Sequence, residues 1–270
     1  MRQIINTYHH DLTSDPERLA GFYEAIQNKA KGTVYDIGAG SGILSIWASA
    51  HSNFVYAVEI NKNVAKRTRS RLKSFKNIKV ITGDARDTLF LKNADLKRAD
   101  LIICEMLDTA LIDEEQVPVL NSVMKYLKED GEIIPYGVIN CVEPVQTAVE
   151  HICYEEHGKP ETEVLGDLTA YSTIKFKGSP TSKLKPIEEK FDTVVDLKIN
   201  SKGMISGMKI TTFTLITPEI ICGPTPMLNP PLIIPTNSLK VDSGDNIKLK
   251  LSYVMGGGLD SIKTSIKKIS

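Results

Sequence analysis

The stretch that decides the fold is Val34-Tyr35-Asp36-Ile37-Gly38-Ala39-Gly40-Ser41-Gly42-Ile43-Leu44-Ser45. A β-branched and aromatic run ends at Asp36, three glycines follow at alternate positions, and an apolar stretch at helical spacing then begins. This pattern predicts a strand, a tight turn and a helix. Glycine permits positive φ and lets a ligand approach the main chain, and the start of a helix offers free N–H groups. We therefore expect a ligand at this turn; a tight turn without a ligand is the alternative.

The spacing of the glycines narrows the class of ligand. A dinucleotide fingerprint, G-x-G-x-x-G, counted from Gly38 would place its third glycine at residue 43, which is Ile43. The third glycine comes one residue earlier, as D-x-G-x-G-x-G. This resembles motif I of the class I methyltransferases that depend on S-adenosylmethionine (SAM).

Composition limits the number of domains, the partners and the cellular location that we expect. The chain has 270 residues and a net charge of zero, which allows one large domain or two smaller ones and gives no global sign of a nucleic-acid partner. The N-terminus lacks a signal-peptide core, and no apolar run is long enough to span a bilayer. The cysteines form no C-x-x-C pair, so we expect no zinc site or disulfide framework and a cytoplasmic location; they are Cys104, Cys141, Cys153 and Cys222.

Strands alternate with helices through residue 135, which predicts a doubly wound α/β domain. The expected strands after the glycine loop are Phe54–Val58, Ile78–Ile81, Ala99–Cys104 and Glu132–Ile134, the last entered by a turn at Lys128–Gly131. An Asn61-capped helix is expected from Lys62 to about Ser74.

Beyond Tyr136 helical periodicity nearly disappears and β-rich runs recur, at Thr193–Ile199, Met208–Ile216 and Ile247–Val254. We therefore expect an all-β second domain, a barrel or a sandwich, with the chain divided into residues 1–135 and 136–270. The polar segment 156–166 is expected to be a loop or projecting arm.

Three charged side chains are candidates for the ligand site. Glu59 ends the second strand, where a carboxylate can accept both ribose hydroxyls; a solvated glutamate is the alternative. Asp84 follows the third strand and could accept from an adenine amino group, or be a plain turn acid. Arg18 falls in the first turn of a helix that starts at Ser14-Asp15-Pro16-Glu17, where a cation is disfavoured, so its local sequence favours an ordinary exposed arginine.

Three longer segments are similar to the protein arginine methyltransferases. Ala99–Pro135 looks like their double-Glu hairpin loop with the following helix and strand, because Glu105 and Glu114 keep the family's separation of nine residues. His9 through Arg18 resembles the family's H-x-x-M-L-x-D-x-x-R helix, and Val241–Ile247 its V-x-x-G-D-x-I turn.

This resemblance implies SAM as cofactor, S-adenosyl-L-homocysteine as product, and a guanidinium held by the catalytic pair Glu105 and Glu114. Two carboxylates can orient a planar cation by charge-assisted hydrogen bonds; the alternative for Glu114 is a helix-opening acid favoured by the dipole. In the family, the arginine that matches Arg18 pairs with the cofactor's carboxylate. The expected cofactor-binding residues are His9, Arg18, Asp36, Gly38, Ala39, Gly40, Gly42, Glu59, Ile60, Asp84 and Ala85.

The chain departs from the family on the substrate side. Pro226-Met227-Leu228 stands where the family has a Thr-His-Trp loop, so the usual histidine is a methionine. The second domain is also shorter than the family's, so a full dimerisation arm is not expected, while a homodimer stays open. A protein is the expected substrate and a small molecule the alternative. No N/D-P-P-aromatic segment follows the fourth strand, and Asn229-Pro230-Pro231-Leu232 is interpreted as a loop.

Two other functions stay open. One is a SAM-dependent methyltransferase for RNA or a small metabolite, built on the same scaffold. The other is a SAM-binding protein with little activity, which the missing histidine favours and the retained acids oppose.

Overall fold

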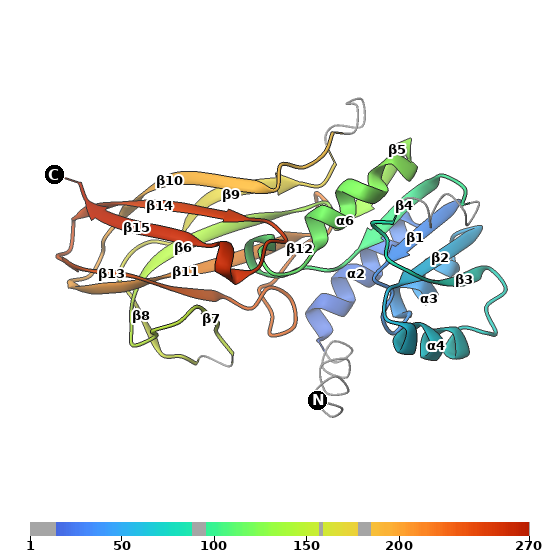
Figure 1. Ribbon diagram of the computed structural model, residues 1–270, viewed down its shortest axis with the longest axis horizontal. Helices are drawn as coiled ribbons and strands as arrows, with labels where there is room; N and C mark the ends of the chain where they lie inside the picture. The colour runs from blue at the N-terminus through green and yellow to red at the C-terminus, as the bar shows by residue number, and fades with distance from the viewer. Residues whose placement is uncertain (1–14, 88–95, 157–158, 178–184, 270) are drawn as a thin grey trace.

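The computed structural model describes residues 15–87, 96–156, 159–177 and 185–269. A parallel sheet with its helices occupies one end of an elongated molecule, and long antiparallel strands occupy the other (Figure 1). Helix α2 (Pro16–Lys29) lies where the two parts meet.

The parallel sheet has the strand order β3-β2-β1-β4-β5, and every neighbouring pair is parallel. Its strands are β1 (Thr33–Ile37), β2 (Phe54–Glu59), β3 (Ile78–Thr82), β4 (Ala99–Cys104) and β5 (Leu127–Ile134). Its helices after α2 are α3 (Ile43–Ser49), α4 (Lys62–Arg71) and α6 (Gln116–Val123), with short 3-10 turns η1 (Thr109–Leu111) and η2 (Met124–Tyr126). The expected α/β domain is confirmed, although α4 ends earlier than Ser74.

Both faces of this sheet are covered, which explains why all five residues of β1 are buried. Helices α2 and α3 pack on one face, where Phe22 and Leu44 lie in one cluster with Val34. Helix α6 packs on the other face through Val117 and Leu120.

The prediction for the start of β5 is wrong. Lys128–Gly131 was expected to form a turn, but the strand begins at Leu127. A bulge opposite Ala99 and Leu101 absorbs the extra residues, and Lys128 Nζ lies 2.7 Å from Asp100 Oδ1 on the neighbouring strand.

The antiparallel part contains two sheets. The larger has the order β7-β13-β11-β6-β8, with β12 added to β11 and β9 to β6; the smaller is β10-β14-β15. The strands are β6 (Gly137–Thr147), β7 (Cys153–Tyr154), β8 (Thr162–Val164), β9 (Thr169–Lys175), β10 (Lys190–Lys198), β11 (Gly203–Leu215), β12 (Ile221–Cys222), β13 (Leu232–Val241), β14 (Asn246–Val254) and β15 (Lys263–Lys268), with a 3-10 turn η3 at Leu259–Ser261.

The prediction of an all-β part after residue 136 is confirmed. Of the two expected forms, a barrel or a sandwich, the structure has the sandwich. Among the described strands, the backbone pairing gives two open sheets and no closed barrel. On one side they are bridged by a side chain, because the Asn237 amide donates to the Ile266 carbonyl and accepts from its N–H, both at 3.3 Å. The segment 156–166 was expected to be a loop or projecting arm, and within it Thr162–Val164 forms the short strand β8 against β6.

One apolar cluster runs from the parallel sheet into the sandwich. It joins Ile102 of β4 and Leu120 of α6 to sandwich residues such as Leu197 and Tyr253. The chain passes between the two sheet systems at Pro135, since β5 ends at Ile134 and β6 begins at Gly137. The parallel sheet with its helices and the antiparallel sandwich are therefore packed into one core.

Candidate active site

The carboxyl ends of β1, β2 and β4 bring the expected site residues to one edge of the parallel sheet. Gly38 follows β1, Glu59 ends β2, and Glu105 follows β4. The strand order reverses between β1 and β4, and ligands of open α/β sheets bind in the crevice at such a point.

The glycine loop has the conformation that its sequence predicts. Gly38, Gly40 and Gly42 have φ values of 74°, 50° and 80°, a region that other residues rarely adopt. The N–H groups of Gly38 and Ala39 both donate to the Val58 carbonyl at 2.9 Å, which ties the loop to β2. A Cβ on Gly40 would meet nothing nearer than 3.7 Å, so the main chain is open to a ligand there.

Asp36 lies beneath the loop. It is 1% exposed and accepts a hydrogen bond from the Ser45 hydroxyl of α3. Burial raises its pKa to about 6, and the nearby charges of Glu105 and Glu59 act in the same direction. This hydrogen bond joins the end of β1 to α3, the two elements that flank the glycine loop.

Glu59 connects the loop to the next helix. Its Oε2 accepts from the Gly40 N–H at 3.0 Å, and its Oε1 accepts from the Asn61 N–H at 2.8 Å. Each carboxylate oxygen has a second lone pair, so the side chain can still accept from a ligand. The neighbouring Ile60 is 60% exposed and offers an apolar surface beside Glu59.

Arg18 is buried, contrary to the expectation from its local sequence. Asp15 caps α2 by accepting from the Arg18 N–H at 3.1 Å. The Arg18 guanidinium then reaches across to Glu105, donating from Nε to Oε1 at 2.7 Å and from Nη2 to Oε2. The ion pair with a residue 87 positions away overrides the unfavourable dipole of the helix start.

Glu114 lies on the hairpin between β4 and α6. Glu114 is an exposed residue, but partial desolvation of its carboxyl group raises its pKa, and the charges of Asp113, Glu115 and Glu105 raise it further. Glu105 and Glu114 are therefore within electrostatic reach of each other. The hairpin backbone between them is held by Asp108, a buried acid that no sequence pattern singled out.

Asp84 and Ala85 follow β3 at the same edge. The Asp84 carboxylate is engaged by Arg86, with Nη2 2.7 Å from Oδ2, and Arg86 Nη1 also lies 2.6 Å from Glu115 Oε1. Arg86 thus links the loop after β3 to the glutamate hairpin, a role that sequence reasoning missed. His9 lies outside the described residues.

The sandwich also contacts this site, through the loop between β12 and β13. The Thr225 hydroxyl donates to Asp15 Oδ2, and the Gly223 N–H donates to Glu17 Oε1 at 3.0 Å. The expected replacement of the family's loop was Pro226-Met227-Leu228, and the residue that bonds the α2 cap Asp15 is the threonine directly before it. Thr225 was missed because no local pattern distinguishes it.

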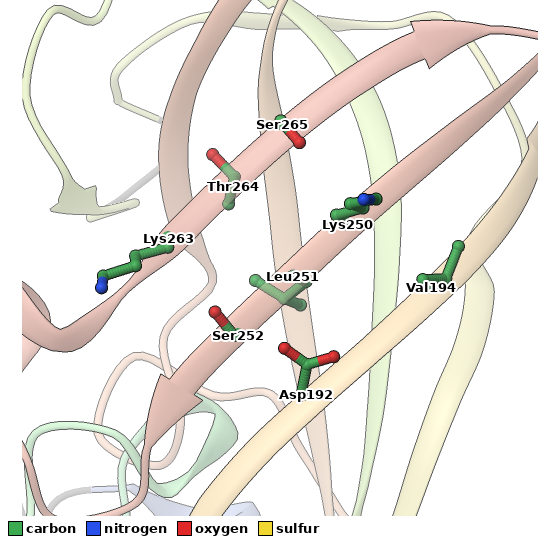
Figure 2. A pocket seen from close by; sticks show the side chains of 8 residues that line it. All are labelled: Asp192, Val194, Lys250, Leu251, Ser252, Lys263, Thr264 and Ser265. Atoms are coloured by element: carbon green, nitrogen blue, oxygen red, sulfur yellow. The ribbon is translucent and has the colours of Figure 1, made fainter.

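Other features lie away from this edge. Figure 2 shows a hollow on the outer face of the small sheet, lined by Asp192, Val194, Lys250, Leu251, Ser252, Lys263, Thr264 and Ser265, none of which was expected in the site. Within the described ranges no cluster of potential metal ligands is found, and the four cysteines are unpaired. No helix in the described part of the chain is long and apolar enough to cross a membrane.

The residues at the edge fit SAM. The open main chain at Gly40 can receive the ligand, Glu59 can accept from hydroxyls, exposed Ile60 can contact a flat ring, and Arg18 carries the charge that a carboxylate requires. The fold and this edge define a class I SAM-dependent methyltransferase, and residues 34–131 match a family described as a methyltransferase domain.

Two archaeal proteins are similar over their whole length. An uncharacterised protein of Methanothermobacter thermautotrophicus is 44% identical over 98% of this chain and 100% of its own. An uncharacterised protein of Methanocaldococcus jannaschii is 37% identical over 98% of this chain and 99% of its own. The chain belongs to the family of these two proteins and is a SAM-dependent methyltransferase that resembles the protein arginine methyltransferases.

That resemblance has a sequence part and a structural part. Protein arginine N-methyltransferase 7 of Gallus gallus is 31% identical over 54% of this chain, a stretch that covers 23% of the chicken protein. The fold matches a chain of the Trypanosoma brucei PRMT1 enzyme–prozyme heterotetrameric complex with AdoHcy at a TM-score of 0.73. The match covers 94% of this chain and 96% of the trypanosomal one, at 13% sequence identity.

Proposed function

We propose that this enzyme is an N-methyltransferase of the arginine-methyltransferase type, acting on a guanidinium or similar cationic nitrogen held by Glu105 and Glu114. The observation that carries the proposal is the way Glu105 pairs with Arg18. Two parallel N–H···O contacts from one guanidinium to one carboxylate are the geometry that a substrate guanidinium requires. This pairing supports the proposal that the Glu105 carboxylate can hold a guanidinium.

The cofactor roles are part of the same proposal. Glu59 accepts from the ribose hydroxyls, Ile60 packs on the adenine, and the Arg18 guanidinium binds the carboxylate of the cofactor. Asp84 and Ala85 border the adenine, while Asp36 joins the two elements that flank the glycine loop. From the family resemblance alone, we also propose that His9 contacts the cofactor.

The two glutamates orient the reacting nitrogen and stabilise its charge. When bound, SAM supplies an electrophilic sulfonium methyl group and leaves as the thioether. A guanidinium is a poor nucleophile because its lone pairs are delocalised, so its orientation in line with the methyl and its electrostatic stabilisation dominate the rate. The nitrogen loses a proton as its new bond forms, and Glu114, whose pKa is raised by desolvation, can accept that proton.

The experiment is transfer of labelled methyl from SAM into a fractionated lysate of the source cell, comparing the wild type with Glu105→Gln. We expect Glu105-dependent label in protein, recovered as methylarginine after hydrolysis, while the variant retains SAM binding. Glu24→Gln is the matched control, since it removes one exposed carboxylate from α2.

The other outcomes separate the alternatives. Label in RNA or in small molecules selects a different substrate on the same scaffold. Absence of label with SAM binding intact identifies a SAM-binding protein with little activity. Full turnover by Glu105→Gln contradicts the two-glutamate mechanism.

We also propose self-association, supported only by the heterotetrameric assembly of the trypanosomal neighbour. Light scattering coupled to size exclusion measures it directly, and a monomer at micromolar concentration contradicts it.

A further inference from the structure

The hairpin that carries both glutamates is organised around the side chain of Asp108. Its carboxylate is 6% exposed and accepts from three backbone N–H groups: Ile112 at 3.2 Å, Asp113 at 2.9 Å and Glu114 at 3.2 Å. Three successive donors on one carboxylate fix the path of the chain up to Glu114. The last of them belongs to Glu114 itself.

A fourth donor comes from the sandwich. The Tyr154 hydroxyl of β7 lies 3.1 Å from Asp108 Oδ2, and β7 is paired with β13 in the large sheet. The buried carboxylate therefore joins the glutamate hairpin to a strand of the other sheet system.

The backbone of the hairpin requires such support. Ala110 and Leu111 are both fully buried and have φ values of 58° and 62°, a conformation that costs about 1–3 kcal/mol per non-glycine residue. The sandwich holds the same turn, since the Ala110 N–H donates to Thr212 Oγ1 at 2.8 Å and Thr109 Oγ1 donates to the Pro230 carbonyl at 2.6 Å. Asp108 completes this set of contacts on the side that leads to Glu114.

We propose that Asp108, together with Tyr154, is a positioning residue that sets the place of Glu114 in the active site. It does not touch the substrate; it acts by holding the peptide groups of residues 112–114. This inference rests on the proposed function, because the role of Glu114 does.

Protonation of Asp108 should loosen the hairpin, because a protonated carboxyl accepts less strongly and adds a donor among four donors. Burial raises its pKa to about 7, against the effect of its hydrogen bonds. The titratable groups around it are Glu114 and Asp113 on the hairpin, Tyr154 on β7 and Tyr253 on β14. Transfer should therefore rise as the pH rises through about 7.

The first test measures order in the hairpin without using activity. Amide hydrogen exchange at residues 112–114 is compared at pH 8 in the wild type, Asp108→Asn and Tyr154→Phe. We expect exchange about 10-fold faster or more in Asp108→Asn and a smaller increase in Tyr154→Phe, because charged hydrogen bonds are lost. Glu24→Gln is the control: it removes an exposed acid from α2 and should leave exchange at residues 112–114 unchanged.

The second test measures transfer to an arginine-containing peptide. We expect Asp108→Asn to lower kcat about 10-fold or more, to leave the Kd for SAM within about twofold, and to lose the rise of kcat near pH 7.

Unchanged exchange in Asp108→Asn overturns the proposal, as does faster exchange with an unchanged kcat and pH profile. If the wild type methylates no protein, the proposed function fails, and the exchange measurement still decides whether Asp108 orders the hairpin. If Asp108→Asn does not fold, exchange and kcat in Tyr154→Phe decide the proposal, because this variant keeps the Asp108 carboxylate and removes only one of its donors.

Discussion

At the scale of single residues, Glu59 shows how a predicted ligand residue is also part of its loop. Its two oxygens accept from Gly40 and Asn61, on either side of the crevice. A change at this position therefore affects both the ligand contacts and the shape of the glycine loop.

We expect Glu59→Ala to weaken SAM binding by about 100-fold or more, because two charge-assisted acceptors are lost from the site. Titration calorimetry with SAM and with its thioether product measures the effect. Glu129→Gln, an exposed acid on β5, is the control. Unchanged affinity in Glu59→Ala would refute the ribose assignment.

Asp36 gives a prediction about stability and pH. Its folded pKa, about 6, lies above the ordinary value of 3.8, so the folded state holds the proton more tightly than the unfolded state. The stability that it contributes is complete below the unfolded pKa and is lost as the pH rises through the folded one.

We therefore expect the free energy of unfolding of the wild type to fall, relative to Asp36→Asn, between about pH 4 and 6. The full change is on the order of 2–3 kcal/mol. Urea titrations at pH 4.5 and 7.5 measure it, and the asparagine can still accept from Ser45. A difference between the two proteins that is independent of pH would show that Asp36 does not titrate in this range.

At the scale of elements, α2 is positioned by the sandwich as well as by its own sheet. Its capping residue Asp15 accepts both from the helix backbone and from Thr225 on the loop after β12. Cys222 and Leu228 from the same region pack in one cluster with Phe22 and Ile26 of α2. The loop thus fixes the helix start from which Arg18 reaches Glu105.

We expect Thr225→Val to destabilise the fold by about 1 kcal/mol, because Asp15 loses a buried donor while the side-chain volume is kept. The SAM-induced increase in Tm should also shrink, since Arg18 is less well held. Thermal unfolding with and without SAM measures both effects. The control is Thr193→Val on β10, and equal Tm values for the two variants would argue against a role for the loop.

At the scale of the whole molecule, we propose that the chain divides into two domains after residue 135 that share one core. The face of α6 that carries Val117, Leu120 and Val123 lies in the same cluster as Leu197 and other sandwich residues. Because neither part buries this face alone, the two should unfold together.

We expect a single calorimetric transition for the full chain, with equal calorimetric and van't Hoff enthalpies. A fragment of residues 1–135 should lack the dispersed amide spectrum of a folded protein and should not bind SAM. A fragment with a native spectrum and full SAM affinity would contradict the shared core.

The sequence was sufficient where the signal is local. The glycine loop needs positive φ, the strands before and after it need continuous apolar runs, and the Asn61 and Asp15 caps need one side-chain acceptor each; all of these can be recognised in a short window. The spacing of Glu105 and Glu114 is likewise a local property of the hairpin. These features determined the fold class and, through the family resemblance, the cofactor.

The tertiary structure alone decided the features that depend on residues far apart in the chain. Arg18 is buried because Glu105 compensates its charge. Asp108 is buried because Tyr154 and the hairpin backbone donate hydrogen bonds to it. Thr225 holds the start of α2 because its hydroxyl donates to Asp15. Residues Lys128–Gly131 form a bulge within β5, so the strand starts at Leu127 through its pairing with Ala99 on β4. A buried polar group is stable only with its partner, so its position becomes predictable only when the fold has brought that partner to it.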